Sequence, residues 1–552
     1  MKIFFRVLLA TALTSAATGC KSFLDVNSNP NNATSVTPDA LLGTALVTTA
    51  ANYSGAATNY NSYASFAVGY WGKSGTVSGF SEERTYNYSS TYYQGLWNAT
   101  YDNLSDYNLI QQQGATSGYQ NHAAIARIMK VYNFLLLVDE YGDIPYTNAL
   151  QGIANTIPTY DKATDIYKDL VVQLKGAVTD INAAPTSARA VSTEDVVFGG
   201  NMTRWKQFAN SLRLRILLRE SSTNDAALNS YVTTEMATLQ SNSATDGYIT
   251  TDVVVQPGYA ANTNQQNPFY NRYGIAAGAT RANAEYSYIV PSKYIIRQYE
   301  GDAKNSPASF VDGRIAQLYT VGTIDSVAAY SGTDLGEANP PQFDPTTTRV
   351  GSRLLLGGAF LRGATAPTVL MLLSEHLFSK AEAETRSLLT NGNAKQDFLD
   401  GIQSSFLTTF RAATTAPIAV STAVTTTAGV SQYNAYINAP TNANNGLVIW
   451  EKTTTTVPNG TDATTTPLAT PRAVSNQEKI LYQKYLAENT IASTEAWDDF
   501  RRTGLPKFKI SAQAGTSPLP KRLIYPQTEV STNNANIPTG VTQFTRIFWE
   551  SL

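Results

Sequence analysis

The sequence predicts a mainly α-helical protein in which stacked helical hairpins carry long irregular loops. Several segments repeat apolar residues at helical spacing, for example Ile125, Ile128 and Tyr132. A helix with one apolar stripe cannot bury that stripe alone, so neighbouring helices must cover it. Between the helical segments, two long stretches at about 230–365 and 407–475 are rich in Asn and Thr and show no sustained period.

Five helices are expected in the N-terminal part of the chain, at about 41–49, 91–114, 125–142, 162–181 and 202–219. Apolar residues recur near helical spacing in these segments, and glycine ends the second and third of them. Because turns join consecutive short helices here, we expect each helix to pack against the next one along the chain.

Two further helices are expected in the C-terminal half. One covers 367–389 and begins with a proline, which suits the first helical position. The other runs toward Thr490 and opens with SNQE at 475–478, the pattern of a capping box. The residues after Pro506 and the Gly-, Ser- and aromatic-rich stretch 60–88 are expected to be loops.

Three tryptophans and a group of arginines lie within or beside the predicted helices. Trp97, Trp205 and Trp497 lie on or next to apolar stripes, so we expect them in the core. The arginines of the segment 213–219 alternate with Leu and Ile, and we interpret them as the polar face of one helix.

The N-terminus has the pattern of a signal peptide. Lys2 and Arg6 accompany an apolar stretch at 3–13, and small residues at 16–19 lie directly before Cys20. Cys20 is the only cysteine in 552 residues. A lone cysteine at this junction is typical of the acylated residue of a bacterial lipoprotein, which carries palmitate or a similar chain. An ordinary secretory signal with a chance cysteine is the alternative.

The segment 20–38 is rich in Asn and Pro, which predicts an extended tether. We expect a single domain at 39–552, with loop insertions at about 230–365 and 407–475. After Cys20 no apolar run reaches the roughly 18 residues that a membrane-spanning helix needs. The mature protein is therefore expected to be anchored to a membrane, or soluble, but not to span one.

Composition and motifs argue against catalysis and nucleic-acid binding. The net charge of −2 gives no overall attraction for nucleic acid. The two histidines, His122 and His376, lie on predicted helices without metal-ligand spacing. Carboxylate pairs such as Asp498 and Asp499 are interpreted as ion pairs or solvated helix ends. We therefore expect no metal, no cofactor and no enzymatic activity.

Several segments resemble one protein family, in the same order along the chain. They are DVNSNPNNATSVTPDALL (25–42), ARIMKVYNFLLLVDEYGDIPYTNAL (126–150), RWKQFANSLRLRILLR (204–219), LSEHLFSKAEA (373–383), EAWDDFRRTGLPKF (495–508) and LPKRLIYPQTE (519–529). The family is that of the SusD-like, or RagB-like, nutrient-binding outer-membrane lipoproteins of Bacteroidota.

The resemblance implies a tetratricopeptide-like scaffold and a lipid-anchored outer-membrane protein. It also implies that the protein forms a lid on a SusC-like TonB-dependent barrel, which imports a captured glycan or peptide. The acidic run that often follows the lipidated cysteine of exported relatives is missing after Cys20. Attachment facing the periplasm is therefore kept as an alternative to the cell surface.

Aromatic side chains in predicted loops are the expected ligand contacts, because aromatic rings stack on the apolar faces of sugars while polar groups pair with hydroxyls. In the stretch GYWGKSG (69–75), glycines on both sides leave the backbone free to present the rings. The candidate ligand-binding residues are Tyr70, Trp71, Phe80, Arg84, Tyr86, Phe269, Tyr270, Asn271, Arg272 and Tyr273. A loop aromatic that only fixes its own loop is the alternative for each.

Two other functions remain open on the sequence alone. A surface-anchored glycan-degrading enzyme would turn over polysaccharides, which the scarcity of histidine does not favour. A structural adhesin would need no neighbouring barrel protein.

Overall fold

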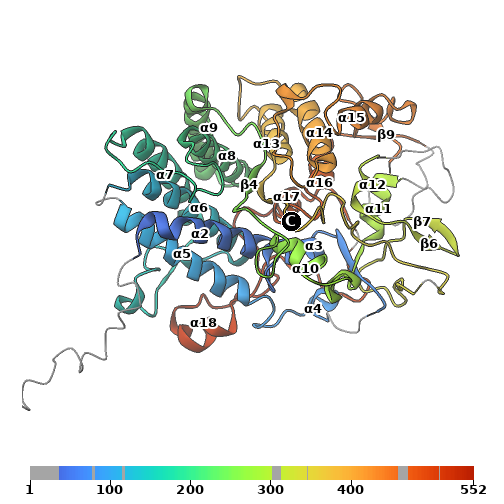
Figure 1. Ribbon diagram of the computed structural model, residues 1–552, viewed down its shortest axis with the longest axis horizontal. Coiled ribbons are helices and arrows are strands. Elements are labelled where there is room, and N and C mark those ends of the chain that lie inside the picture. The colour runs from blue at the N-terminus through green and yellow to red at the C-terminus, as the bar shows by residue number, and fades with distance from the viewer. Residues whose placement is uncertain are drawn as a thin grey trace, which may run out of the picture.

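The computed structural model describes residues 36–76, 81–114, 118–300, 312–344, 346–457, 470–508 and 510–551. Helices dominate these residues, and the strands are short and pair two at a time (Figure 1). The predicted mainly helical fold class is confirmed. Cys20, the signal peptide and most of the tether lie outside the described residues, so those predictions stay predictions.

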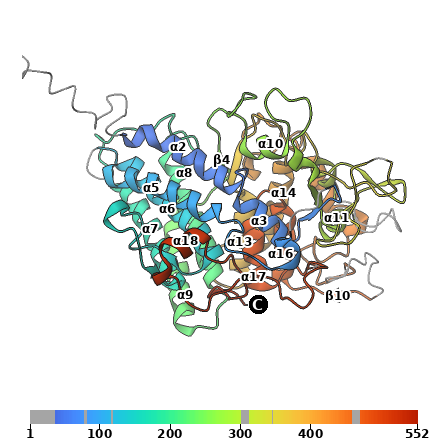
Figure 2. The same ribbon diagram turned by 90° about the horizontal axis from the view of Figure 1, so that it is seen from below.

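The N-terminal part is a row of antiparallel helical hairpins. Its helices are α2 (Pro38–Tyr53), α5 (Gly95–Gly114), α6 (Gln120–Tyr141), α7 (Ala163–Ala183), α8 (Met202–Glu220) and α9 (Ala226–Asp246). From α5 to α9, each helix packs against the next one along the chain, and α2 packs on α5. Both views place this row on one side of the molecule (Figures 1 and 2).

The C-terminal helices form the other side. They are α13 (Leu373–Thr385), α14 (Ala394–Phe410), α16 (Asn476–Glu488) and α17 (Ser493–Thr503). Helix α13 packs on α14 and α16, whereas α17 packs on the early helix α3 (Tyr60–Ala67). Contacts of α13 and α17 with α8 join the two sides.

Short strands and short helices lie in the segments that connect these helices. The strand pairs are β1 (Trp71–Lys73) with β5 (Ile289–Pro291), β2 (Ile144–Pro145) with β3 (Tyr160–Asp161), β4 (Val253–Val255) with β8 (Thr368–Met371), β6 (Gly322–Ile324) with β7 (Val327–Ala329), and β9 (Thr454–Thr455) with β10 (Arg472–Ala473), all antiparallel. The short helices are α4 (Glu82–Thr85), α10 (Pro268–Tyr273), α11 (Lys293–Glu300), α12 (Ile315–Leu318), α15 (Val430–Ile437) and α18 (Gln527–Thr532).

The predicted helix stripes form the core. Trp97, Trp205 and Trp497 are buried, as predicted, with 4 %, 0 % and 0 % of their surface exposed. The indole N–H of Trp205 donates a hydrogen bond of 2.8 Å to Asp195, so its one polar atom is satisfied inside the core. The capping box is also present in part, because the Ser475 hydroxyl accepts the backbone N–H of Glu478 at 3.1 Å.

Several predicted elements differ from the structure. The predicted loop insertion at 407–475 begins inside α14 and contains α15, and the tail after Pro506, predicted as a loop, contains α18. The stretch 60–88, predicted as a loop, contains α3, β1 and α4. The predicted loop insertion at 230–365 begins inside α9, whose start is capped by Asp225. The predicted helix at 367–389 begins instead with strand β8, because its β-branched start pairs with the three valines of β4.

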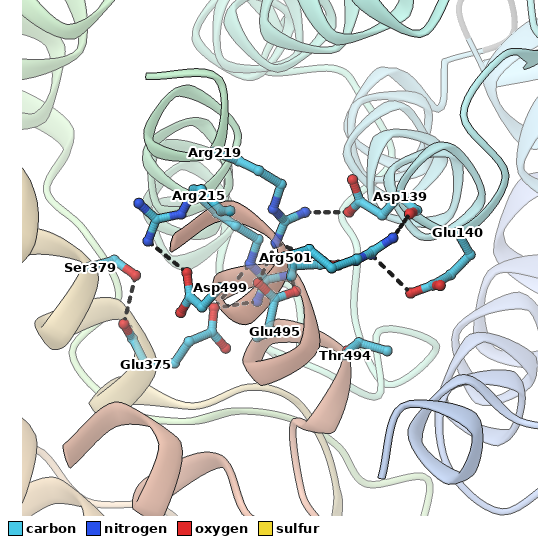
Figure 3. A network of polar contacts seen from close by, with 12 residues as sticks. Asp139, Glu140, Arg215, Arg219, Glu375, Ser379, Thr494, Glu495, Asp499 and Arg501 are labelled. Atoms are coloured by element: carbon cyan, nitrogen blue, oxygen red, sulfur yellow. Dashed lines mark hydrogen bonds and ion pairs between the residues drawn. The ribbon is translucent and has the colours of Figure 1, made fainter. Parts of the chain in front are cut away.

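The arginines of 213–219 do not form an exposed polar face, so that interpretation is also wrong. Arg215 forms ion pairs with Glu375 at 2.7 Å and Glu495 at 3.1 Å. Arg219 lies 2.7 Å from Glu495 and also pairs with Asp139 of α6. All of these side chains are buried, and they lie between α6, α8, α13 and α17 (Figure 3).

A third arginine, Arg501, extends this buried network. Arg501 of α17 donates a hydrogen bond of 2.7 Å to the backbone carbonyl of Asp139 and lies 3.4 Å from the carboxylate of Glu140. Burial raises the pKa of Glu140, although the guanidinium of Arg501 opposes this effect. Acidic and basic side chains of four helices therefore neutralise one another at the centre of the molecule.

Candidate functional site

Two clefts lie side by side where the strand pair β1–β5 meets helix α4. In this pair Lys73 lies opposite Ile289, and Lys73 lines the larger cleft whereas Ile289 lines the smaller one. Helix α4 divides the clefts in the same way, because Glu83 lines the smaller cleft and Arg84 the larger.

The smaller cleft has a volume of about 420 Å³, and we call it the aromatic cleft. Its aromatic side chains are Phe66, Tyr92, Tyr93, Tyr273 and Tyr288. They come from α3, the turn before α5, the end of α10 and the residue before β5. Segments far apart in the sequence thus converge on one cleft, which is the size of many small-ligand sites.

Tyr93 is held firmly at the cleft. Its ring centroid lies 4.9 Å from that of Tyr92 and 5.6 Å from that of Tyr63 behind it. Its hydroxyl is 3.1 Å from the Ser62 hydroxyl. The backbone of Tyr93 has φ +52°, in the left-handed region that residues other than glycine rarely adopt. Such strained positions persist where neighbours fix them and are common at ligand sites.

Charged groups complete the aromatic cleft. Arg272 lies 3.8 Å from Glu285, and its Nε atom has no hydrogen-bond partner within the described part of the chain. The carboxylate of Glu82 accepts hydrogen bonds from the N–H and hydroxyl of Ser89 at 3.0 and 2.5 Å. Burial raises the pKa of Glu83, which is only 5 % exposed. The cleft therefore offers both donors and acceptors around its rings.

Trp71 and Tyr70 are not presented at the surface, so that prediction is wrong. Both are 0 % exposed. The indole N–H of Trp71 donates to the Thr490 hydroxyl at 2.9 Å, and the Tyr70 hydroxyl donates to the carbonyl of Tyr485 at 2.6 Å. The neighbouring glycine permits close packing instead of display, because a Cβ at Gly72 would lie 2.1 Å from a methyl group of Thr333.

Trp71 supports the aromatic cleft indirectly, by packing against a residue that lines it. Its ring meets the ring of Tyr273 edge to face, with the centroids 5.5 Å apart. Because Tyr273 lines the aromatic cleft, Trp71 fixes one of its walls.

The other predicted ligand-binding residues do not lie together in one cleft. Arg272 and Tyr273 lie in the aromatic cleft, and Arg84 lies in the larger one. Tyr86 is buried, and its hydroxyl accepts the N–H of Ser511 at 2.8 Å.

Phe269, Tyr270 and Asn271, three of the remaining predicted contacts, line neither cleft. Phe269 and Tyr270 line a separate pocket of about 50 Å³. Asn271 is exposed, and its backbone carbonyl accepts a hydrogen bond of 2.5 Å from Asn283. Phe80 lies outside the described residues.

Sequence reasoning missed Tyr92 and Tyr93. It began a helix at about residue 91, whereas α5 begins at Gly95, so these rings lie in the turn before the helix. The glycine in YYQGLW was the available signal, because glycine is unfavourable inside a helix and is found at helix boundaries.

The larger cleft has a volume of about 850 Å³ and is polar. Lys73, Arg84 and Arg349 line it together with Asp334 and Glu337. Glu337 forms an ion pair of 2.6 Å with Arg349. Although burial acts to raise it, hydrogen bonds from Arg349 and Lys293 lower the pKa of Glu337 to about 2.

Neither a metal-binding cluster nor a membrane-spanning helix occurs in the part of the chain that the structure describes. Within those ranges, no three His, Cys, Asp or Glu side chains are grouped so that they could hold a metal ion. In the same ranges, no helix combines the length and the apolar character needed to cross a bilayer.

The hairpin row, the C-terminal helices and the clefts between their loops define a helical scaffold with loop-built clefts. The chain belongs to the SusD-like family. The profile of that family, described as "Starch-binding associating with outer membrane", matches residues 30–526. No curated protein sequence matches the chain.

Solved structures of SusD homologues have the same fold. A protein described as "Bacteroidetes AC2a SusD-like" superposes with a TM-score of 0.69 at 19 % identity, covering 94 % of this chain and 100 % of that one. A SusD homologue from Parabacteroides distasonis gives 0.67 at 18 % identity, covering 93 % and 98 %. A protein described as a "chitin-binding protein" gives 0.65 at 20 % identity, covering 93 % and 100 %.

Proposed function

We propose that this protein captures a glycan in the aromatic cleft and delivers it to a SusC-like TonB-dependent transporter in the outer membrane. A peptide is the alternative cargo. The observation that carries the proposal is the cleft itself, which is lined by five aromatic residues, three glutamates and one arginine. The starch-binding description of the family and the similarity to a chitin-binding protein support a glycan.

The physical match is to a sugar. The ring faces of a sugar are lined by C–H groups, which stack on aromatic rings such as those of Tyr93 and Tyr273. Sugar hydroxyls donate to the carboxylates of Glu82 and Glu285 and accept from Arg272. A preformed cleft with rigid rings loses little conformational freedom on binding, which favours affinity.

The rest of the proposal concerns location. A signal peptide over residues 1–19 and acylation of Cys20 would place the protein on the outer membrane, facing outward. The family description, which includes association with the outer membrane, supports this placement. The protein would then bind without converting its ligand, as a subunit of an importer.

Substitution of Tyr93 tests the site. Tyr93→Ala removes a half-buried ring that lines the cleft at the turn before α5, so we expect glycan affinity to fall about 5- to 150-fold, or about 1–3 kcal/mol. Titration calorimetry with a panel of neutral oligosaccharides, including starch and chitin fragments, would measure the affinity of the variant and of the wild type.

Tyr231→Ala is the matched control, because Tyr231 lies half-buried on α9 in the hairpin row, outside both clefts. The control should bind like the wild type. Unchanged affinity of Tyr93→Ala, or hydrolysis of the oligosaccharides by the wild type, would contradict the proposal.

A further inference from the structure

The small pocket lined by Phe269 and Tyr270 also contains an arginine, Arg362, and we call it the arginine pocket. Its volume is about 50 Å³. One buried water molecule needs roughly 10–15 Å³. The arginine pocket therefore has room for a few water molecules or a small ion, but not for a sugar ring. Its polar side chains are those of Ser54, Asn267, Tyr270, Arg362, Thr368 and Thr490.

The guanidinium group of Arg362 has no acidic partner. It donates one hydrogen bond, from Nη2 to the backbone carbonyl of Thr408. Its Nε atom has no hydrogen-bond partner, and Arg362 forms no ion pair with any residue that the structure describes. Because a guanidinium carries five N–H donors, most of the donors of Arg362 are unused.

A second arginine, Arg411, pairs with the nearest carboxylate, that of Asp252. Oδ2 of Asp252 lies 3.2 Å from Nη1 of Arg411 and accepts the Thr408 hydroxyl at 2.8 Å. Oδ1 of Asp252 accepts the backbone N–H of Leu373 at 3.0 Å. Both oxygens of Asp252 are therefore occupied. Thr408 contacts Asp252 through its hydroxyl and Arg362 through its carbonyl, which places the second guanidinium beside the first pair.

The wall of the arginine pocket consequently carries an excess of positive charge. The charged side chains that act on Arg362 are Arg411 and Asp252, so two guanidinium groups accompany one carboxylate. Burial and the positive charge of Arg411 lower the pKa of Arg362 to about 9, although Asp252 opposes this effect. A cation in such surroundings is stabilised when an anion lies next to it.

Two hydroxyl groups of the arginine pocket are available as further donors. Ser54 is only 7 % exposed, and Tyr270 is half-buried on α10. Neither hydroxyl forms a hydrogen bond with another residue in the described part of the chain. Because buried polar groups normally have a partner, the Ser54 hydroxyl indicates that a polar group occupies this pocket.

We propose that the arginine pocket binds a small monovalent anion, a chloride ion or a carboxylate such as formate, which accepts hydrogen bonds from Arg362 and from the pocket hydroxyls. Hydrogen bonds between ionised groups are about twice as strong as neutral ones, and the arginine fork suits a carboxylate in particular. The anion would neutralise the excess charge of the two arginines. It would also fix helix α10, whose Arg272 and Tyr273 line the aromatic cleft.

Thermal melting at constant ionic strength tests this assignment. Sodium gluconate, whose anion is too large for the pocket, would be replaced stepwise by sodium chloride or by sodium formate at a total of about 0.2 M, so that general screening stays the same. We expect the melting temperature to rise by about 1–3 °C and then to level off, because a saturable ligand stabilises the folded state. The two titrations distinguish chloride from a carboxylate. A crystal structure with formate, or with bromide located by its anomalous scattering, should show the anion beside Arg362.

Variants locate the effect. Arg362→Gln should abolish the rise in melting temperature, because the main donor is lost. Ser54→Ala should raise the anion concentration at half effect about 2- to 10-fold, the loss of one hydrogen bond. Arg189→Gln is the matched control and should respond like the wild type. The side chain of Arg189 is 57 % exposed and pairs with Asp39 at 2.6 Å, outside the pocket.

Three results would overturn the assignment. The wild type could melt at the same temperature in gluconate, chloride and formate, or a folded Arg362→Gln variant could keep the full rise. Crystals could also show bromide and formate only at other places on the surface. If Arg362→Gln does not fold, the response of Ser54→Ala and the position of the anion in the wild-type crystal decide. Binding of neutral glycans through Tyr93 is measured separately, so either proposal can fail while the other stands.

Discussion

At the scale of single residues, the burial of Trp71 reverses the effect expected from its sequence. The glycines on both sides of Trp71 predicted an exposed loop, in which removal of the indole ring would hardly change the free energy of unfolding. Trp71 is instead 0 % exposed and touches Phe66, Phe269 and Tyr273. We therefore expect Trp71→Ala to lower the free energy of unfolding by about 3–5 kcal/mol, the range for a large buried aromatic.

Urea unfolding of Trp71→Ala beside the wild type would measure this loss. Glycan affinity should fall as well, because the wall formed by Tyr273 loses its support. A stability change below about 1 kcal/mol, typical of surface positions, would show that Trp71 is not part of the core.

Residue types predicted part of the site, but not its geometry. Arg272 and Tyr273 were found because they are an arginine and a tyrosine in a polar segment, and both line the aromatic cleft. Tyr92 and Tyr93 were missed because their role depends on where α5 begins, which is a difference of four residues. Trp71 was misplaced because glycine permits either an open loop or close packing, and only the tertiary contact with Thr333 decides between them.

At the scale of elements, buried ion pairs connect the two sides of the scaffold. Arg219 of α8 pairs with Asp139 of α6 and with Glu495 and Asp498 of α17, the last at 3.0 Å. Removing this one cation takes an ion-pair partner from three buried carboxylates. Asp139 has no other such partner among the described residues, whereas Glu495 keeps Arg215 and Asp498 keeps Arg501. We expect Arg219→Met to destabilise the protein by about 3–5 kcal/mol, the cost of breaking a buried pair from one side.

The matched control for Arg219→Met is Lys162→Met. The side chain of Lys162 is 72 % exposed and pairs with Asp143 at 2.8 Å. An exposed pair contributes less than about 1 kcal/mol, so thermal melting of this variant should resemble that of the wild type. Equal melting temperatures for the two variants would mean that the buried network does not hold the helices together.

The helices α6, α7 and α8 were predicted from their apolar stripes, since one period explains both local structure and packing. Helix α9 was not predicted. Its polar face is rich in Ser and Thr, although Leu228, Val232, Met236 and Leu239 form its buried stripe. The arginines of α8 were assigned to solvent because charged residues are rarely buried, and their acidic partners on α13 and α17 are distant in sequence.

At the scale of the whole molecule, the proposed ligand site and the proposed anchor belong to different parts of the chain. Both clefts are formed by residues after position 56, whereas the proposed anchor is Cys20, before the first described helix. A lipid anchor would therefore hold the protein at the membrane without entering the ligand site. Affinity for glycan and attachment to the membrane should then be separable by mutation.

Substitution of the anchor tests this separation. Cys20→Ala should move the protein from the membrane pellet to the soluble fraction, because no acyl chain can then be attached. The purified variant should keep wild-type affinity for glycan and wild-type melting, since its clefts and core are unchanged. In cells, a barrel protein that co-purifies with the wild type after cross-linking should be recovered less efficiently with the variant, because the two partners are no longer held at one membrane. Unchanged fractionation, with no lipid detected on the wild type by mass spectrometry, would show that Cys20 is not the anchor.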